Sequence, residues 1–294
     1  MNRLDLHLHT NISDDGEFAP EELIRMCCEN GLRTVAVTDH NSTRAYPAAH
    51  KQARELGMTL IPALELDCQF HGTNLHVLAY GIDPYDEAFS RYEKSILEQE
   101  QKGSAARLEA IRSLGMVVEE EKIQALARNG VITGEMIAEV ALQDKKNDRH
   151  PLLIPYREGG NRSDNPYVDF YWDFCSQGKP AYAAVAYMTL AQAVTMIEES
   201  GGFAVLAHPG INIGKNAEAF QEIVTNGICG VEAYSSYHDA DTVRFYIAQA
   251  KAQHVLLTLG SDFHGKTKPS IRLGAFSVRE ENEILEAFME RFHH

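Results

Sequence analysis

The sequence is poor in cysteine, and its cysteines form no pattern that would hold a metal or a disulfide framework. The five cysteines, at positions 27, 28, 68, 175 and 229, include no C-x-x-C pair and no even set. Disulfide frameworks use even sets of cysteines, and thiolate metal sites use closely spaced pairs. We therefore expect buried, reduced thiols and a cytoplasmic protein.

Long apolar runs are also missing. A membrane-spanning helix needs about eighteen or more consecutive apolar residues, and no such stretch occurs. The N-terminus enters an apolar strand pattern almost at once, without the basic and apolar segments of a secretion signal. We therefore expect no membrane partner.

Basic residues are scarce relative to acidic ones. The chain has 27 Lys and Arg against 42 Asp and Glu, a net charge of −15. A surface of this sign repels long polyanions, so we expect no long nucleic acid as a partner. This electrostatic repulsion matters less for a short anionic molecule, because divalent cations bound at a site would reverse the local field.

The chain nevertheless has the size and apolar content of a well-packed globular protein, with 294 residues of which 44% are apolar. Apolar runs bounded by turn residues predict strands near residues 4–8, 34–38, 60–66, 75–80, 203–207, 229–234 and 255–259. Helical patterns that end near glycine lie between several of them, at residues 20–30, 43–56 and 189–200. Such alternation predicts an α/β fold with parallel strands and crossover helices.

The alternation fails between residues 85 and 179. This stretch is charged and mostly helical at first, and then becomes a loop rich in polar residues, glycine and proline. We interpret it as a helical subdomain inserted between strands, which forms a lid or a substrate wall. Residues 1–84 and 180–294 would then form the main domain.

Histidines and carboxylates recur where the predicted strands end. Leucines alternate with Asp5, His7 and His9, so strand geometry puts both imidazoles on one face. The most ligand-like groups are His7, His9, Asp14, His40, Glu65, His76, His208, Asp262 and His264. A mixed imidazole and carboxylate set suits zinc, manganese, iron or cobalt better than calcium. If the strands share a parallel barrel, their carboxyl ends deliver these side chains to one mouth.

In sequence order these motifs resemble those of the PHP (polymerase and histidinol phosphatase) superfamily of metal-dependent phosphoesterases. The motifs are His7-x-His9-Thr10, Ser13-Asp14, Thr38-Asp39-His40, Glu65, His76, His208-Pro209 and Asp262-x-His264. The resemblance covers both ends of the chain and implies a distorted (β/α)7 TIM-like barrel. The chain looks most like the stand-alone bacterial group that acts on small phosphorylated metabolites, including nucleoside bisphosphate phosphatases and cyclic phosphate phosphodiesterases.

The resemblance also implies a set of ligands for two or three divalent ions of manganese, zinc or iron. His7, His9, Glu65 and Asp262 would hold the first ion, Glu65 would bridge to a second ion held by His76 and His208, and Asp14, His40 and His264 would hold a third. Water shared by a bridged pair is acidified enough to act as a hydroxide nucleophile. Glu65 and Asp262 are therefore our principal catalytic candidates.

Other polar residues are candidates for roles outside the metal-ligand set. Asp39 either orients a ligand imidazole or caps the following turn. His238 follows another strand and is our candidate for an acid or a substrate contact. Arg149, Arg157, Lys266 and Lys268 are the candidate phosphate contacts. Many relatives carry an arginine after the Ile-Thr step that is followed here by Gly134-Glu135, which weakens any direct transfer of bisphosphate specificity.

The leading hypothesis is a metal-dependent hydrolase of phosphate mono- or diesters of small metabolites, namely nucleotides or sugar cyclic phosphates. Its alternative within enzymes is hydrolysis of a C–N (amide) bond on the same type of barrel. A PHP module degraded to a binding or structural role would lack ligands, whereas this sequence has all nine. Oligomeric state is not predictable from these features.

Overall fold

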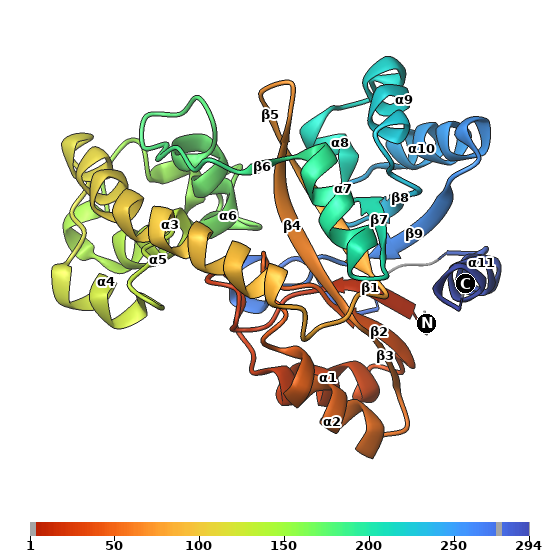
Figure 1. Ribbon diagram of the computed structural model, residues 1–294. Helices are drawn as coiled ribbons and strands as arrows, with labels where there is room; N and C mark the ends of the chain where they lie inside the picture. The colour runs from red at the N-terminus through yellow and green to blue at the C-terminus, as the bar shows by residue number, and fades with distance from the viewer. Residues whose placement is uncertain (1–3, 275–277, 294) are drawn as a thin grey trace.

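The computed structural model describes residues 4–274 and 278–293 of the chain (Figure 1). The strands are β1 (Leu4–Leu8), β2 (Thr34–Val37), β3 (Thr59–Ile61), β4 (Ala63–Phe70), β5 (Thr73–Tyr80), β6 (Met188–Thr189), β7 (Phe203–Leu206), β8 (Gly230–Ser235) and β9 (Leu256–Gly260). The α-helices are α1 (Pro20–Glu29), α2 (Tyr46–Glu55), α3 (Glu87–Ser113), α4 (Glu120–Leu126), α5 (Gly134–Gln143), α6 (Pro166–Phe170), α7 (Leu190–Glu199), α8 (Pro209–Asn212), α9 (Ala217–Thr225), α10 (Ala240–Gln253) and α11 (Glu281–Phe292). Shorter helical turns are η1 (Lys145–Asn147), η2 (Ile154–Tyr156), the π-helix η3 (Tyr171–Cys175) and η4 (Gly265–Thr267).

The strands form two sheets, with orders β1-β2-β3 and β6-β4-β5-β7-β8-β9. Pro62, which has no backbone N–H, separates β3 from β4, so the single strand predicted at residues 60–66 is divided between the sheets. Two isolated parallel bridges join the sheets, between Leu8 and Phe263 and between His40 and Glu65. The fold is α/β with mainly parallel strands, as expected, but the described residues do not form a closed barrel.

Strand β5 runs antiparallel to both of its neighbours, so the expectation of parallel strands throughout was wrong here. Only His71 and Gly72 connect β4 to β5, and both have positive φ angles, of 48° and 79°. Such two-residue turns join hairpins, whereas parallel strands need a crossover of about a dozen residues or more. His76 consequently reaches the site from within a strand and not from its carboxyl end.

Strand β1 shows how the sequence positions the site. Leu4 and Leu6 are fully buried in an apolar cluster with Leu78, Val205 and Leu259 of the neighbouring strands. Because side chains alternate along a strand, the polar residues between these leucines face the other way. The apolar face of β1 therefore fixes the direction in which its histidines point.

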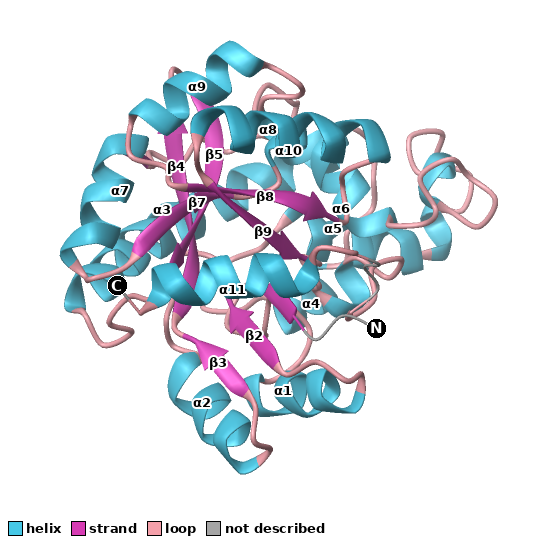
Figure 2. Ribbon diagram, turned by 90° about the vertical axis from the view of Figure 1, so that its right-hand side faces the viewer, coloured by secondary structure: helices cyan, strands magenta, loops and turns pink. Residues whose placement is uncertain are grey.

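Helices cover the strands from outside (Figure 2). Contacts join α7 to β7, α10 to β8 and α11 to β9 around the larger sheet, and α2 to β3 beside the smaller one. Phe220 and Ile223 of α9 and Tyr246 of α10 are fully buried against the larger sheet. Burial of apolar side chains in these layers supplies the main stabilisation of the fold.

Residues 85–179, called here the helical lobe, lie beside the strands, at the left of Figure 1. The lobe has its own apolar cluster, which includes Ile111, Ile137 and Phe170. Helix α3 connects it to the sheets, because Phe89 near its start packs with β4 and β5, whereas Ile111 near its end belongs to the lobe. One continuous helix thus spans both parts.

Within the described ranges, no helix combines the length and the apolar character needed to cross a bilayer.

Candidate metal centre

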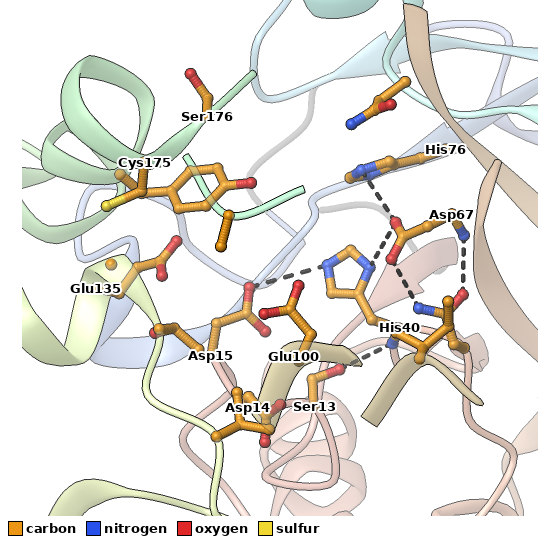
Figure 3. Close-up of a pocket in the computed structure, with 18 of the residues that line it drawn as sticks. Ser13, Asp14, Asp15, His40, Asp67, His76, Glu100, Glu135, Cys175 and Ser176 are labelled. Atoms are coloured by element: carbon orange, nitrogen blue, oxygen red, sulfur yellow. Dashed lines mark hydrogen bonds and ion pairs between the residues drawn. The ribbon is translucent and has the colours of Figure 1, made fainter. Parts of the chain in front are cut away.

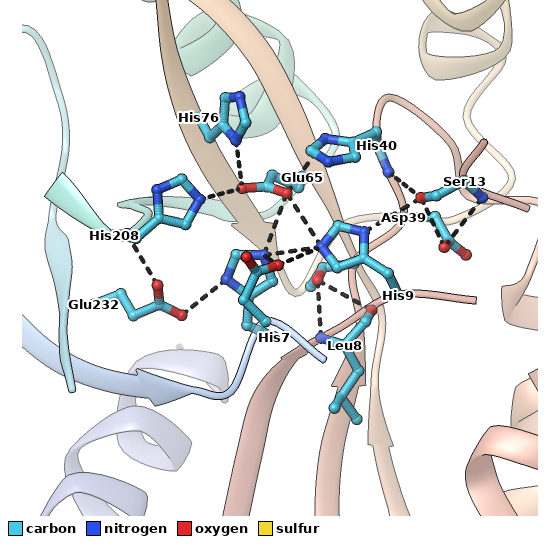
Figure 4. Close-up of polar contacts among 12 residues, drawn as sticks. His7, Leu8, His9, Ser13, Asp39, His40, Glu65, His76, His208 and Glu232 are labelled. Carbon is cyan, nitrogen blue, oxygen red and sulfur yellow. Dashed lines mark hydrogen bonds and ion pairs between the residues drawn. The ribbon is translucent and has the colours of Figure 1, made fainter. Parts of the chain in front are cut away.

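Both histidines of the first motif lie at the carboxyl end of β1, on the face opposite its leucines (Figure 4). His7 and His9 are fully buried, and their Nε2 atoms lie 3.0 Å apart. Glu65 Oε2 lies 3.2 Å from His7 Nε2 and 3.3 Å from His9 Nε2. Asp262 Oδ1 lies 3.2 Å and 3.1 Å from the same two nitrogens. Two imidazoles and two carboxylates therefore turn toward one another.

Glu65 lies at the centre of the histidines and is fully buried (Figure 4). Its Oε1 lies 3.0 Å from His76 Nδ1 of β5 and 3.1 Å from His208 Nε2, which follows β7. Its Oε2 also lies 3.3 Å from His40 Nδ1. Burial alone would raise the pKa of Glu65, but the charges of His7, His76 and His40 hold that pKa well below its usual value. The ionised form of the carboxylate is therefore favoured, and its two oxygens face different histidines.

Ligand atoms gather in four overlapping groups, and within each group they lie no more than 4.8 Å apart. The groups are His7, His9, Glu65 and Asp262; Glu65, His76 and His208; His9, Asp15, His40 and His264; and His40, Asp67 and His76. Several of these atoms are buried without a hydrogen-bond partner, among them Glu65 Oε2, His40 Nδ1 and His264 Nε2. An unsatisfied buried polar group costs about 1–3 kcal/mol, and a bound cation would satisfy these atoms. The donor set fits divalent transition metals.

Asp15, and not the adjacent Asp14, supplies the carboxylate of the third group. Asp15 Oδ2 lies 3.1 Å from His264 Nε2 and 3.9 Å from His40 Nε2. Asp14 belongs to none of the four groups and lines the adjoining cavity, where burial, with the charges of Asp15 and Glu100, raises its pKa to about 7. The two acids lie in a loop without periodicity, so the sequence could not tell which of them turns toward the histidines.

Asp67 is a member of the fourth group that we did not expect from the sequence. It lies opposite His76 in the register of β4 and β5. Its Oδ1 lies 3.2 Å from His76 Nε2 and 3.6 Å from His40 Nδ1, and its Oδ2 accepts a hydrogen bond from Asn41 at 2.7 Å. Because strand side chains alternate, Asp67 shares a face with Glu65, and this spacing was the available signal.

Glu232 holds two of the histidine-bearing segments in place. It is fully buried, its Oε1 lies 2.9 Å from His7 Nδ1, and its Oε2 accepts the backbone N–H of His208 at 2.9 Å. A carboxylate bonded to Nδ1 fixes the tautomer in which Nε2 is free to bind a metal. The sequence signal was a lone acid in the apolar run at residues 229–234, to which we gave no role.

Asp39 acts on the site through its neighbours. Among the described residues, it neither contacts an imidazole directly nor caps the following turn with its side chain. Its Oδ1 accepts hydrogen bonds from Thr10 N at 2.7 Å and from Ser13 Oγ at 3.0 Å. Ser13 Oγ in turn lies 3.2 Å from His9 Nδ1 and accepts the backbone N–H of His40 at 2.9 Å. Asp39 therefore orders the loop after β1, and Ser13 makes the contact with the imidazole.

Asp262 is oriented by two donors on its far side. Its Oδ2 accepts hydrogen bonds from Tyr237 at 2.7 Å and from Lys268 at 2.6 Å. Burial opposes ionisation, but the charge of Lys268 is the largest influence holding the pKa of Asp262 well below its usual value. These contacts leave Oδ1 turned toward His7 and His9.

Backbone strain accompanies two of these positions. His208 and Asp262 adopt positive φ angles, of 23° and 56°. Non-glycine residues are rarely held in this region, and such residues cluster at functional sites. The side chains of both residues belong to the groups of possible metal ligands.

His238 does not enter the site. Its Nδ1 donates to the carbonyl of Ala233 at 2.9 Å, and its Nε2 accepts the backbone N–H of Gly210 at 2.9 Å. Burial lowers its pKa, so the ring is neutral. With both nitrogens occupied by backbone groups, it joins β8 to α8 and has no free atom for the acid or substrate role that we expected.

Three of the four expected phosphate contacts also point elsewhere. Arg149 is exposed and does not line the cavity beside the metal groups. Arg157 donates to the carbonyl of Leu142 at 3.1 Å, and Lys266 pairs with Glu139 at 2.7 Å. Only Lys268 lines the cavity, and the sequence gave no signal that Arg44 and Arg107 line it too.

A cavity of about 360 Å³ lies between the metal groups and the helical lobe (Figure 3). Asp15, His40, Asp67 and His76 line it on the strand side. The lobe contributes acids and several residues of η3 and the segment after it. Pockets of a few hundred Å³ accommodate small molecules, so one end of a small ligand would reach the histidines.

Comparison with known families identifies one match. The PHP domain family matches residues 5–151, which contain the first six of the metal-ligand candidates in sequence order.

Curated relatives match almost the full length of the chain. The 5'-3' exoribonuclease Rnm of Escherichia coli is 29% identical over 92% of this chain and 87% of its own length. The 3',5'-nucleoside bisphosphate phosphatase of Chromobacterium violaceum is 28% identical over 90% of this chain and 88% of its own. The phosphoribosyl 1,2-cyclic phosphate 1,2-diphosphodiesterase of Eggerthella lenta is 26% identical over 89% and 94%.

Solved structures share the fold. An amidohydrolase from Chromobacterium violaceum has a TM-score of 0.76 at 22% identity, covering 97% of this chain and 96% of its own. A putative metal-dependent phosphoesterase from Bifidobacterium adolescentis has a TM-score of 0.76 at 23% identity, covering 98% and 96%.

Proposed function

The chain belongs to the PHP domain family and is a metal-dependent phosphoric ester hydrolase, and we propose that it hydrolyses phosphate mono- or diesters of small metabolites, such as nucleotides or sugar cyclic phosphates. The observation that carries the proposal is the buried Glu65 carboxylate, with histidines against both of its oxygens. A cavity of about 360 Å³ opens beside this group. A carboxylate with two such sides is suited to share two cations.

Our proposed ligand assignment follows the groups of converging atoms. We assign His7, His9, Glu65 and Asp262 to one ion, Glu65, His76 and His208 to a second, and Asp15, His40 and His264 to a third. Asp15 takes the place that we had expected Asp14 to hold, and Asp67 is a further carboxylate within reach of His40 and His76. The ions would be manganese, zinc or iron, for which this donor set is suited.

When bound, divalent cations supply Lewis acidity that offsets phosphoryl charge and lowers the pKa of water. The residues of the chain position this chemistry. Glu232 orients His7, and Tyr237 and Lys268 orient Asp262. Lys268 also lines the cavity, and we propose that its ammonium group contacts the substrate phosphate there.

The helical lobe would form the substrate wall, and residues 1–84 and 180–294 would form the metal-binding part. The lobe contributes much of the cavity lining, which supports this division. We also propose that the two sheets are the two parts of a distorted (β/α)7 barrel. The isolated bridges of Leu8 with Phe263 and of His40 with Glu65 lie where those parts meet.

We propose small substrates and not long nucleic acids. The net charge of −15 and an enclosing cavity support this choice. One relative is named a 5'-3' exoribonuclease, so RNA belongs among the substrates tested. Five free thiols support a reducing location such as the cytoplasm.

Amide hydrolysis remains the alternative, but no specific observation favours it. The neighbour named an amidohydrolase is 22% identical, a level that shows the fold alone.

The test is a hydrolysis screen of the manganese-loaded full-length chain. We expect release of p-nitrophenol from p-nitrophenyl phosphate or bis-p-nitrophenyl phosphate. Particular nucleotides or cyclic phosphates should be hydrolysed faster than these two model esters. A p-nitroanilide and a long RNA should be poor substrates. Hydrolysis of the anilide without release from any phosphate ester would contradict the proposal, as would degradation of long RNA faster than that of every small ester.

A further inference from the structure

Every arginine or lysine that lines the cavity, within the described ranges, is already paired with a carboxylate. The pairs are Arg44 with Glu93 at 2.6 Å, Arg107 with Glu100 at 2.8 Å and Lys268 with Asp262 at 2.6 Å. Arg107 also donates to the carbonyl of Ile132 at 2.6 Å. Lys268 lies beside the metal groups, whereas the two arginines lie in the part of the cavity that faces the lobe. That part consequently has no unpaired cation to receive a second phosphate.

A carboxylate of the chain itself occupies the helix terminus that faces the cavity. Helix α5 begins at Gly134, its N-cap Thr133 accepts the backbone N–H of Met136, and Glu135 in the first turn is only 8% exposed. Helix N-termini attract anions through their free N–H groups and their dipole. Glu135 lies in this first turn and lines the cavity, so its carboxylate competes for the position where a substrate anion would otherwise bind.

Further acids surround Glu135. Figure 3 shows it on the side of the lobe, across from Asp15, and Asp14 and Glu100 line the same cavity. Burial and the charge of Asp15 raise the pKa of Glu135 to about 7. Above that pH Glu135 is ionised, and a phosphate entering this part would meet negative charge that no unpaired cation offsets.

The same part of the cavity is rich in aromatic side chains. Tyr171 and Trp172 of the π-helix η3 line it, together with Tyr182 and Tyr187. Aromatic faces stack favourably on other ring systems. The cavity thus offers a ring-binding wall and an acidic helix terminus, with metal ligands at its other end.

Building on the proposed function, we propose that the cavity selects phosphate esters of a ring-containing organic group that carries no second phosphate, and that Glu135 is the residue that excludes the second phosphate. The scissile phosphate lies at the metal end, the ring lies against Tyr171 and Trp172, and Glu135 accepts a hydrogen bond from a hydroxyl or amino group of the substrate. Glu135 is a specificity-determining residue in this account and takes no part in the chemical step.

The test compares two nucleotides as inhibitors of p-nitrophenyl phosphate hydrolysis by the manganese-loaded full-length chain, at about pH 8, where a carboxyl group with a moderately raised pKa is ionised. Adenosine 5′-monophosphate and adenosine 3′,5′-bisphosphate differ only by the second phosphate. We expect the monophosphate to bind more tightly to the wild type. Glu135→Gln keeps the shape of the side chain and removes its charge. It should strengthen inhibition by the bisphosphate, relative to inhibition by the monophosphate, by about tenfold or more.

Glu121→Gln is the matched control, because Glu121 is exposed on α4 and its replacement makes the same change in charge outside the cavity. Its inhibition ratio should equal that of the wild type. Glu135→Ala serves as a second variant if Glu135→Gln does not fold.

Bisphosphate binding as tight as that of the monophosphate in the wild type would overturn the inference. So would an unchanged ratio in a folded Glu135 variant. Absence of p-nitrophenyl phosphate hydrolysis with any divalent metal would instead count against the proposed function, which keeps the two failures apart.

Discussion

Glu65 is the residue on which the proposed chemistry depends most. Its two oxygens face different histidines, at 3.0–3.3 Å. In the proposed arrangement two cations share this carboxylate, so removing its charge should release at least one of them.

Glu65→Gln should therefore retain fewer ions and turn over slowly. We expect the loss of at least one metal per chain and a fall in kcat of about two decades or more, which corresponds to roughly 3 kcal/mol of barrier. Folding should persist, because the strand cores are apolar. Elemental analysis and steady-state kinetics measure both effects. A folded variant with its full metal content and normal kcat would refute the shared-carboxylate role.

Glu232→Gln tests a residue that orients a ligand without facing the cavity. The carboxylate accepts from both His7 Nδ1 and the His208 backbone N–H, whereas an amide has only one accepting oxygen. One donor must then face the amide NH₂ group. We expect metal affinity to fall by about 10–100-fold, as is typical when the partner of a metal-bound histidine is lost.

Titration of the metal-free Glu232→Gln variant with manganese measures that affinity. Glu121→Gln, exposed on α4, is the matched control. Equal affinity in Glu232→Gln and the wild type would show that Glu232 does not act through His7.

Single residues were predictable where periodicity fixes a direction. Alternation in β1 identified His7 and His9, and the structure brings their Nε2 atoms to 3.0 Å of each other. Periodicity is absent in the loop of Asp14 and Asp15, so only the folded structure shows which of them faces the histidines. The buried pairing of His238 with two backbone groups was equally invisible in the sequence.

At the scale of elements, the loop after β1 is held by the lobe. Arg128, which follows α4, donates through Nη1 to the carbonyls of Asn11, Ser13 and Gly16 at 3.2, 3.1 and 2.6 Å. This loop carries Asp15, whose backbone carbonyl also accepts a hydrogen bond from Thr267 of η4. The lobe thus contributes to the geometry of the metal groups as well as to the cavity.

Arg128→Ala should loosen this loop and weaken the group that contains Asp15. We expect lower occupancy of one ion and a fall in kcat of about tenfold, with KM little changed, because the cavity wall itself stays in place. Arg91→Ala is the matched control, since Arg91 is an exposed residue of α3 that pairs with exposed Glu87. Unchanged metal content and kcat in Arg128→Ala would rule out the tether.

Elements were predictable except where the chain direction reverses. The alternation of strands and helices gave the α/β class, but the short apolar runs did not reveal that β5 is antiparallel. The signal was the two-residue connection His71-Gly72, which is too short for any crossover helix. Pro62 was likewise the sign that residues 60–66 hold two strands and not one.

At the scale of the whole molecule, side chains that could hold metal ions come from β1, β4 and β5 and from the segments after β1, β2, β7 and β9. They meet beside a cavity that the lobe helps to line. Most of these residues could be selected from the sequence, because histidines and acids recur where several of the predicted strands end. It could not show the cavity, because the lobe residues that line it come from separate helices whose packing is tertiary.

The most direct test of the metal-dependent hydrolysis is a titration. Metal-free full-length protein is given manganese stepwise while release of p-nitrophenol from p-nitrophenyl phosphate is measured together with bound metal. The overlapping ligand groups predict no release without metal, and a rate that rises until about two to three ions are bound per chain. A metal-free chain that already releases product at the full rate, or a rate that reaches its maximum with only one ion bound per chain, would contradict the account.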